Sequence, residues 1–194
     1  MQSLSELSLA EFQESLTPDQ IRTSRIIHSA MAAGILSFGS AVLYLYSRTE
    51  AADPDTELIS TLNLLSLVNA VVAVGSWIAG RVLFERQFSS YNLKDSLSRP
   101  MTTQEGRIIE MTAGQRCISI IRTAFIIRLA LFEGSAFLGL AVSMIAALRG
   151  AAAVDPQYLF NMITAAAAIA FIGVTFPSRE HFEGIFQEQF KRST

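Results

Sequence analysis

The chain has 194 residues, of which 51% are hydrophobic and only 16% are charged, and its formal net charge is −2. Soluble domains carry about 25% charged residues, so this composition is typical of a membrane protein. The chain has no basic patch with interleaved aromatic residues, which argues against a nucleic-acid partner. The single cysteine, Cys117, excludes an internal disulfide, and we interpret it as a small apolar filler.

Residues 1–20 are polar and acidic, and they lack the basic start and apolar stretch of a signal peptide. Their irregular apolar stripe fits either a short surface helix or a frayed tail. A helix start is predicted by Thr17, Pro18 and Gln20. Thr17 can cap the helix, Pro18 suits the first helical position, and Gln20 can complete a capping box.

Four apolar segments are long enough to cross the hydrocarbon layer, which is roughly 30 Å thick and takes about 20 apolar residues. They cover residues 26–46, 58–83, 118–148 and 158–176. The predicted fold class is therefore all-α: a polytopic membrane protein with a four-helix transmembrane domain over residues 21–176. Residues 84–116 form its long polar loop, in which residues 103–111 are expected to form a short helix.

The first and third spans contain a repeated sequence. Residues 21–42 and 121–142 match at ten of 22 positions without a gap when the chain is shifted by 100 residues. We interpret the match as an internal duplication of two helical hairpins, residues 21–83 and 121–176. Four glycines recur within it, and small residues let membrane helices approach closely. The predicted helix-packing glycines are Gly34, Gly39, Gly134 and Gly139.

The basic residues predict the orientation of the spans, because cytoplasmic loops are rich in Lys and Arg. The N-terminal segment, the 84–116 loop with the adjoining Arg81, and the C-terminal segment hold eleven such residues flanking the spans. The two short connections hold only Arg48 and Arg149. We therefore expect a bacterial inner-membrane protein with both termini in the cytoplasm, whose two hairpins form a parallel repeat.

The C-terminal segment, residues 177–194, has an amphipathic pattern. Ser178 can cap a helix, and Phe182, Ile185, Phe186 and Phe190 lie near one face of it. Such a face either rests on the membrane surface or packs on the cytoplasmic loop of the protein itself. Both alternatives stay open on the sequence alone.

Polar residues inside the predicted spans are costly, and they indicate function by default. The intramembrane candidates are Glu133, Arg128, Asn69 and His28. Arg128 can extend its side chain to the cytoplasmic surface, and His28 occupies the matching place in the first repeat. Glu133 replaces Ala33 of the first repeat, and it is expected to find a polar partner on another helix, such as Asn69 or Ser76.

The sequence offers no Gly-rich phosphate loop, no Cys/His metal spacing and only two histidines. We therefore expect neither catalytic residues, nor a metal, nor a cofactor. The expected partners are the lipid bilayer and other membrane proteins or further copies of this chain.

The run RTAFIIRLALFEGSAFLGLAV, with TFPSREHFEGIF at the end of the fourth span, resembles a group of small bacterial four-helix membrane proteins of unassigned function. The resemblance covers mainly residues 116–190 and implies no activity. The helix around Glu133 also resembles the carboxylate helix of rotary ATPase proteolipid subunits. The second span, however, lacks their glycine ladder, and the loop is much longer than theirs.

Two functional hypotheses follow. The first is a structural or accessory component that binds other membrane proteins. The alternative is a small ion- or proton-handling membrane subunit that uses Glu133. They differ in whether Glu133 faces a wet cavity or a subunit interface, or is fully packed.

Overall fold

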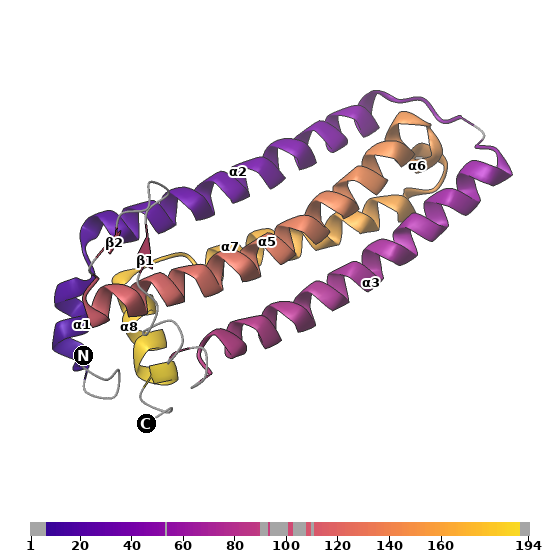
Figure 1. The fold of residues 1–194 in the computed structure, drawn as a ribbon. Helices are drawn as coiled ribbons and strands as arrows, with labels where there is room; N and C mark the ends of the chain where they lie inside the picture. Colours follow the sequence, from indigo (N-terminus) through magenta and orange to yellow (C-terminus); the bar gives the residue numbers. More distant parts are fainter. Residues whose placement is uncertain are drawn as a thin grey trace. The chain divides into compact units, whose positions relative to one another are not determined.

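The computed structural model describes residues 7–52, 54–89, 93, 101–102, 108–109 and 111–190 (Figure 1). Four of the described helices are long and apolar enough to cross a membrane: α2 (Pro18–Arg48), α3 (Thr56–Gln87), α5 (Ala113–Leu148) and a fourth segment, Pro156–Val174. The fourth combines a 3-10 helix, η2 (Pro156–Met162), with α7 (Ile163–Val174). The predicted all-α fold with four transmembrane helices is confirmed.

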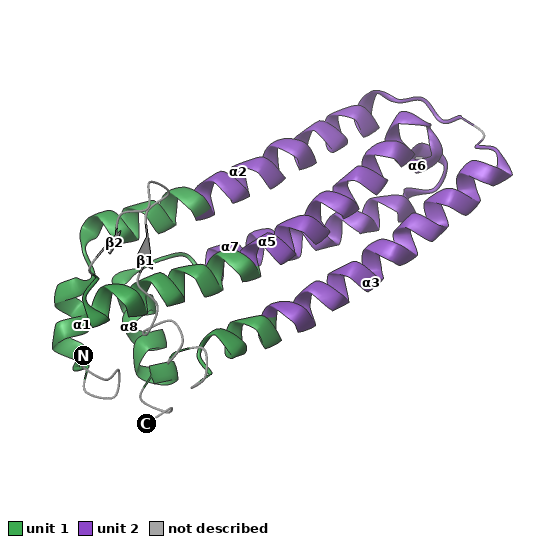
Figure 2. Cartoon of the chain, viewed as in Figure 1, with its two compact units in different colours: residues 1–27, 81–128, 175–194 green, residues 28–80, 129–174 purple. Residues whose placement is uncertain are grey.

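The chain divides into two compact units (Figure 2). Unit 1 contains residues 1–27, 81–128 and 175–194, and unit 2 contains residues 28–80 and 129–174. Each of α2, α3 and α5 contributes one part to unit 1 and the other part to unit 2. Both chain termini and the long connection between α3 and α5 belong to unit 1.

The helix starts follow the capping residues. A short helix, α1 (Leu9–Ser15), begins with a capping box between Ser8 and Glu11, so a short helix, and not a frayed tail, forms here. The Gln20 Oε1 atom accepts a hydrogen bond from the Thr17 backbone N–H at 3.0 Å, and α2 starts at Pro18 as predicted. Asp55 caps α3 by accepting from the Leu58 backbone N–H at 2.7 Å.

Unit 1 has an aromatic core. The rings of Phe12 and Phe186 stack with their centroids 4.3 Å apart, and Cys117 and Phe182 are buried in the same cluster. Phe182 belongs to α8 (Arg179–Ile185), and Phe186 opens a π-helical turn, Phe186–Phe190. The C-terminal phenylalanines therefore pack inside unit 1, against Phe12 of α1 and, through Phe190, against Phe88 in the 84–116 segment.

The connection between α3 and α5 contains a two-stranded antiparallel ladder between β1 (Met101–Thr102) and β2 (Ile108–Ile109). The expected helix over residues 103–111 is therefore wrong at Ile108 and Ile109. Residues 103–107 and 110 lie outside the described part of the chain.

Unit 2 exposes apolar side chains as a membrane-spanning body must. Seventeen of the 21 exposed large hydrophobic residues in the described chain belong to it, among them Leu36, Leu67 and Val71. The part of α5 inside unit 2, Leu129–Leu148, is about 30 Å long at 1.5 Å per residue. Its length matches the hydrocarbon thickness, so the exposed apolar surface of unit 2 suits contact with lipid.

His181 makes unit 1 sensitive to acid. Its Nε2 atom is buried without a hydrogen-bond partner among the described residues, and its ring centroid lies 5.2 Å from that of Phe125. Burial lowers the pKa of this imidazole from its usual range. The unfolded chain therefore binds the proton at a higher pH than the folded chain does.

We expect the thermal unfolding midpoint of the detergent-solubilised protein to fall as the pH drops below about 6.5, the pKa of an unperturbed histidine. Above that pH the contribution of His181 should be constant. His181→Phe should reduce the fall between pH 7.5 and pH 5, because the phenyl ring cannot be protonated. An equal fall in both proteins would contradict the role of His181.

Candidate functional site

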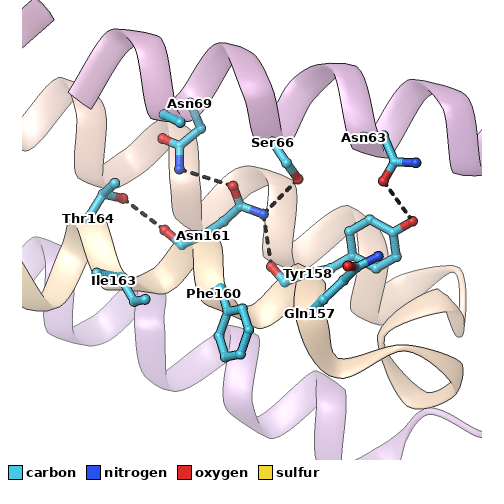
Figure 3. A pocket seen from close by; sticks show the side chains of 10 residues that line it. Asn63, Ser66, Asn69, Gln157, Tyr158, Phe160, Asn161, Ile163 and Thr164 are labelled. Atoms are coloured by element: carbon cyan, nitrogen blue, oxygen red, sulfur yellow. Dashed lines mark hydrogen bonds between the residues drawn. The ribbon is translucent and has the colours of Figure 1, made fainter. Parts of the chain in front are cut away.

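Polar residues of α3 and of the start of the fourth span line a groove in unit 2 (Figure 3). The groove has a volume of about 390 Å³. Its lining comes from two segments only, and none of the lining residues carries a formal charge. These residues are Asn63, Ser66, Asn69, Ala70, Gln157, Tyr158, Phe160, Asn161, Ile163 and Thr164.

Local sequence explains why η2 begins where it does. Asp155 caps it by accepting from the Gln157 backbone N–H at 3.0 Å, and Pro156 takes the first helical position. In a 3-10 helix, residues three apart lie on the same face. Tyr158 and Asn161 therefore share one side of η2, and Figure 3 shows this side turned toward α3.

Side chains bond two backbone carbonyl oxygens of η2. Ser143 on α5 donates to the Tyr158 oxygen at 3.0 Å. Thr164 donates to the Asn161 oxygen at 2.8 Å. Inside a hydrocarbon layer, carbonyl groups have no water to bond. These hydroxyl groups therefore stabilise the irregular start of the fourth span.

The orientation of both amides in the groove is fixed by one carbonyl. The Asn161 Nδ2 atom donates to the Tyr158 backbone oxygen at 3.0 Å and to Ser66 Oγ at 2.9 Å. A carbonyl oxygen only accepts, so the nitrogen of Asn161 must point toward it. The Asn161 Oδ1 atom then faces Asn69 and accepts from its Nδ2 at 3.1 Å.

This orientation leaves one hydrogen-bond acceptor of the amide pair without a donor among the described residues. Asn69 is only 2% exposed, and its Oδ1 atom has no hydrogen-bond partner among the described residues. The predicted candidate Asn69 is thus part of the site, and its partner is Asn161, not Glu133.

Gly139 lets α5 approach this network. A Cβ atom at Gly139 would collide with the Asn161 backbone oxygen and with Thr164 Oγ1, and it would lie 3.0 Å from Asn69 Nδ2. This close approach is what the predicted packing role of Gly139 requires.

The other three predicted packing glycines differ in their surroundings. A Cβ atom at Gly34 would lie 3.5 Å from Phe137, and one at Gly39 would lie 3.7 Å from Leu140, so both glycines of α2 face α5. Gly134 is exposed, and a Cβ atom there would meet no atom within 4 Å. The predicted packing role of Gly134 within the chain is wrong.

The remaining polar candidates lie outside the groove. Glu133 is half-buried on α5, and it makes no hydrogen bond or ion pair with the described residues. The expected partner for it on another helix is therefore missing from this part of the chain. Arg128, in unit 1, places its guanidinium carbon 5.6 Å from the centre of the Phe84 ring, and His28 is buried in unit 2.

Sequence reasoning missed Tyr158, Asn161 and Thr164. Their spacing of three is the available signal, because it places residues on one face of a 3-10 helix and on neighbouring positions of an α-helix. The seven-residue spacing of Leu62, Asn69 and Ser76 was a second signal. All three are buried on α3.

No protein-family model, curated protein or solved structure matches this chain. Among the described residues, no group of three or more His, Cys, Asp or Glu side chains can hold a metal ion. What the groove offers chemically is hydrogen bonding by neutral amides and hydroxyl groups.

Gly139→Ala should lower the thermal unfolding midpoint in detergent, because the new methyl group must displace the Asn161 carbonyl and the Thr164 hydroxyl. Overpacking of this kind typically costs about 1–3 kcal/mol. Gly134→Ala is the matched control, since it faces open space and alanine favours a helix by up to about 1 kcal/mol over glycine. It should leave the midpoint unchanged or raise it. Equal effects of the two substitutions would contradict the close approach at Gly139.

Proposed function

We propose that this chain is a structural or accessory protein of the bacterial inner membrane, which binds another membrane protein through α5. The observation that carries the proposal is Glu133. This carboxyl group lies within a predicted membrane span and has no hydrogen-bond or ion-pair partner among the described residues.

The surface beside Glu133 is suited to helix contact. Ala130 and Gly134 are exposed and lie one turn apart on α5, and no atom would contact a Cβ at Gly134. Small residues at this spacing let a second membrane helix approach closely. A helix seated there would come within reach of Glu133, its neighbour in the chain.

The free-energy cost of placing the Glu133 carboxyl in the membrane favours a bonding partner for it. A charged carboxyl at the centre of the bilayer costs about 2.5–3.5 kcal/mol on insertion scales. A hydroxyl, amide or cationic group from a docked helix would offset that cost. The partner we propose is therefore a membrane protein with a polar side chain in its span; a second copy of this chain is one such protein.

The proposed location follows from the distribution of basic residues. The segments of unit 1 carry thirteen of the fifteen Lys and Arg residues, and unit 2 carries only Arg48 and Arg149. Both termini belong to unit 1. This asymmetry supports a bacterial inner-membrane orientation with unit 1 on the cytoplasmic side.

The proposal also includes the duplication of residues 21–83 and 121–176. It is supported by the ten identities in 22 positions, which lie within α2 and α5. The second hairpin has diverged at its outer end, where η2 begins the fourth span.

A reporter enzyme that is active only in the periplasm tests the orientation. Fused after Thr194 it should be silent, and inserted within residues 51–55 it should be active, because the basic residues hold unit 1 in the cytoplasm. The reverse pattern would overturn the proposed location of both termini.

A photo-crosslinking residue at Gly134 tests the proposed interface in native membranes. We expect it to form one predominant adduct with a membrane protein. The same residue at Gly75, which is also exposed and where a Cβ atom would meet nothing within 4 Å, is the matched control and should not form that adduct. Glu133→Ala should reduce the adduct severalfold, whereas Glu133→Gln should largely keep it, because the amide can still form hydrogen bonds. Equal adducts at both positions would exclude a specific partner on this face.

The same unpartnered carboxyl supports a second candidate, a small ion- or proton-handling subunit. Here Glu133→Gln has the opposite consequence. The variant should fold and yet abolish proton flux in proteoliposomes, since an amide cannot release a proton. Absence of flux through the wild-type protein under a pH gradient would remove this candidate for the isolated chain.

A further inference from the structure

We propose that a basic pocket in unit 1 binds the phosphate group of an anionic phospholipid. The pocket has a volume of about 230 Å³, and all its lining residues belong to unit 1 (Figure 2). These residues are Leu16, Pro18, Ile21, Arg22, Arg25 and Arg179. The site shares no residue with the α5 face of the proposed function and does not depend on it.

Three arginines meet in this pocket from segments far apart in the sequence. Arg22 and Arg25 lie near the start of α2, whereas Arg179 is the first residue of α8. None of the lining residues is acidic. Like charges repel one another, so an anion that contacts these guanidinium groups lowers the free energy of the cluster. The planar fork of an arginine side chain matches the oxygens of a phosphate group, which makes phosphate the anion that this pocket suits best.

Backbone carbonyl groups hold two of the arginines in place. Arg25 Nε donates to the Pro177 oxygen at 2.9 Å, and Arg179 Nη2 donates to the Gln13 oxygen at 3.0 Å. A carbonyl group carries no net charge, so these hydrogen bonds position the guanidinium groups without neutralising them. The two terminal NH₂ groups of Arg25 make no hydrogen bond with the described residues and can therefore donate to a ligand. Positioning before binding reduces the entropy that the ligand must offset.

The third arginine, Arg22, makes no hydrogen bond or ion pair with the described residues. All five of its N–H groups can therefore donate to a ligand. Asp19, one turn earlier on α2, does not line the pocket. Arg22 and Arg25 are exposed, and the side chain of Arg179 is 53% exposed, so a ligand at the protein surface can reach all three groups. The positive end of the α2 dipole, at Pro18, adds to their attraction for an anion.

Two carboxylates of α8 lie close to these arginines. Glu183 accepts from Arg179 Nε at 3.1 Å. The pKa of Glu180 is lowered mainly by hydrogen bonds from its own backbone N–H and from the Ser178 hydroxyl, and less by Arg179 and Arg25. Neither carboxylate lines the pocket, so the charged groups that face a ligand inside it are all cationic.

The position of the pocket favours a lipid as the source of the phosphate. The fourth membrane-capable segment ends at Val174, just before the Pro177 carbonyl that holds Arg25. Ile26 directly follows Arg25 on α2 and is 59% exposed, and Phe176 is 42% exposed. Basic pockets at the ends of membrane helices bind lipid head groups. A phosphate in this pocket would therefore have apolar side chains beside it for its acyl chains.

The head group must be small and must carry a net negative charge. A volume of about 230 Å³ is below the range of about 300–1,000 Å³ for sites that enclose a drug-sized molecule, so the pocket holds a head group and leaves the acyl chains outside. The phosphate of phosphatidylcholine is already compensated by its own ammonium group. Phosphatidylglycerol has the same phosphate without a cation, and it is therefore the better ligand.

Titration calorimetry of the full chain in dodecyl maltoside tests the proposal, with the heat from empty micelles subtracted. The probes are dioctanoylphosphatidylglycerol, dioctanoylphosphatidylcholine and inorganic phosphate. The second lipid tests the need for net negative charge. Inorganic phosphate distinguishes a free phosphate from a lipid, because it has the same anionic oxygens but no acyl chains.

We expect saturable binding of the phosphatidylglycerol, with affinities for the other two probes that are roughly tenfold weaker or more. Absence of saturable binding by the phosphatidylglycerol would overturn the proposal. Equal affinity for the two lipids would remove the role of charge and overturn it as well. Equal or tighter binding of inorganic phosphate would assign the pocket to a free phosphate and exclude the lipid.

Variants locate the binding. Arg22→Gln removes charge-assisted hydrogen bonds to the ligand and should weaken binding roughly tenfold. It should fold as the wild type does, because Arg22 bonds none of the described residues. Arg81→Gln is the matched control: Arg81 also lies in unit 1, is 66% exposed in its side chain and pairs with Glu85, but it does not line the pocket. It removes the same charge and should bind the lipid as the wild type does.

Arg25→Gln and Arg179→Gln should also weaken binding, although each loses a bond to a backbone carbonyl. If these two variants do not fold, the pair Arg22→Gln and Arg81→Gln decides alone. Equal weakening in that pair would indicate a general attraction to net charge, and wild-type affinity in Arg22→Gln would place the lipid elsewhere. Either result would overturn the assignment of this pocket.

Discussion

The structure of unit 2 depends on one constraint: inside a hydrocarbon layer, every backbone polar group must find its partner within the protein. The fourth span begins with a 3-10 helix in place of an α-helix, and its carbonyl groups receive hydrogen bonds from Ser143 and Thr164. Gly139 makes this possible, because any side chain there would collide with the Asn161 carbonyl. The contact of α5 with the fourth span therefore follows from hydrogen bonding as much as from apolar packing.

The same constraint distinguishes the polar groove from Glu133. In the groove, each amide group is oriented by its neighbour, and the chain of hydrogen bonds stops at Asn69 Oδ1. On α5, Glu133 belongs to no such chain within the described residues. The groove thus holds a fixed amide network whose last acceptor, Asn69 Oδ1, is buried without a partner among the described residues. Glu133 is a single group, for which we propose a partner outside the chain.

The spans and caps could be predicted from the sequence because both are local. Twenty apolar residues and the Thr17-Pro18-Gln20 start specify a membrane helix without any knowledge of its neighbours. The groove could not be predicted, since Asn69 and Asn161 are far apart in sequence and meet only in the folded chain. The repeated glycines show the same limit. A Cβ atom at Gly139 would collide with the fourth span and one at Gly134 would meet nothing within 4 Å, although the letters match equally well.

The 3-10 helix at the start of the fourth span also links the length of that span to the direction in which its side chains point. At about 2.0 Å per residue, η2 stretches the 19-residue segment to about 32 Å, against about 28 Å for an unbroken α-helix. The stretched form thus matches a layer of ordinary thickness, whereas winding η2 into α-helix would shorten the segment. Such winding over seven residues would turn one end of η2 relative to the other by roughly 140°. Tyr158 and Asn161, three residues apart, would turn relative to each other by roughly 60°, so the alignment of their side chains toward α3 depends on the 3-10 geometry.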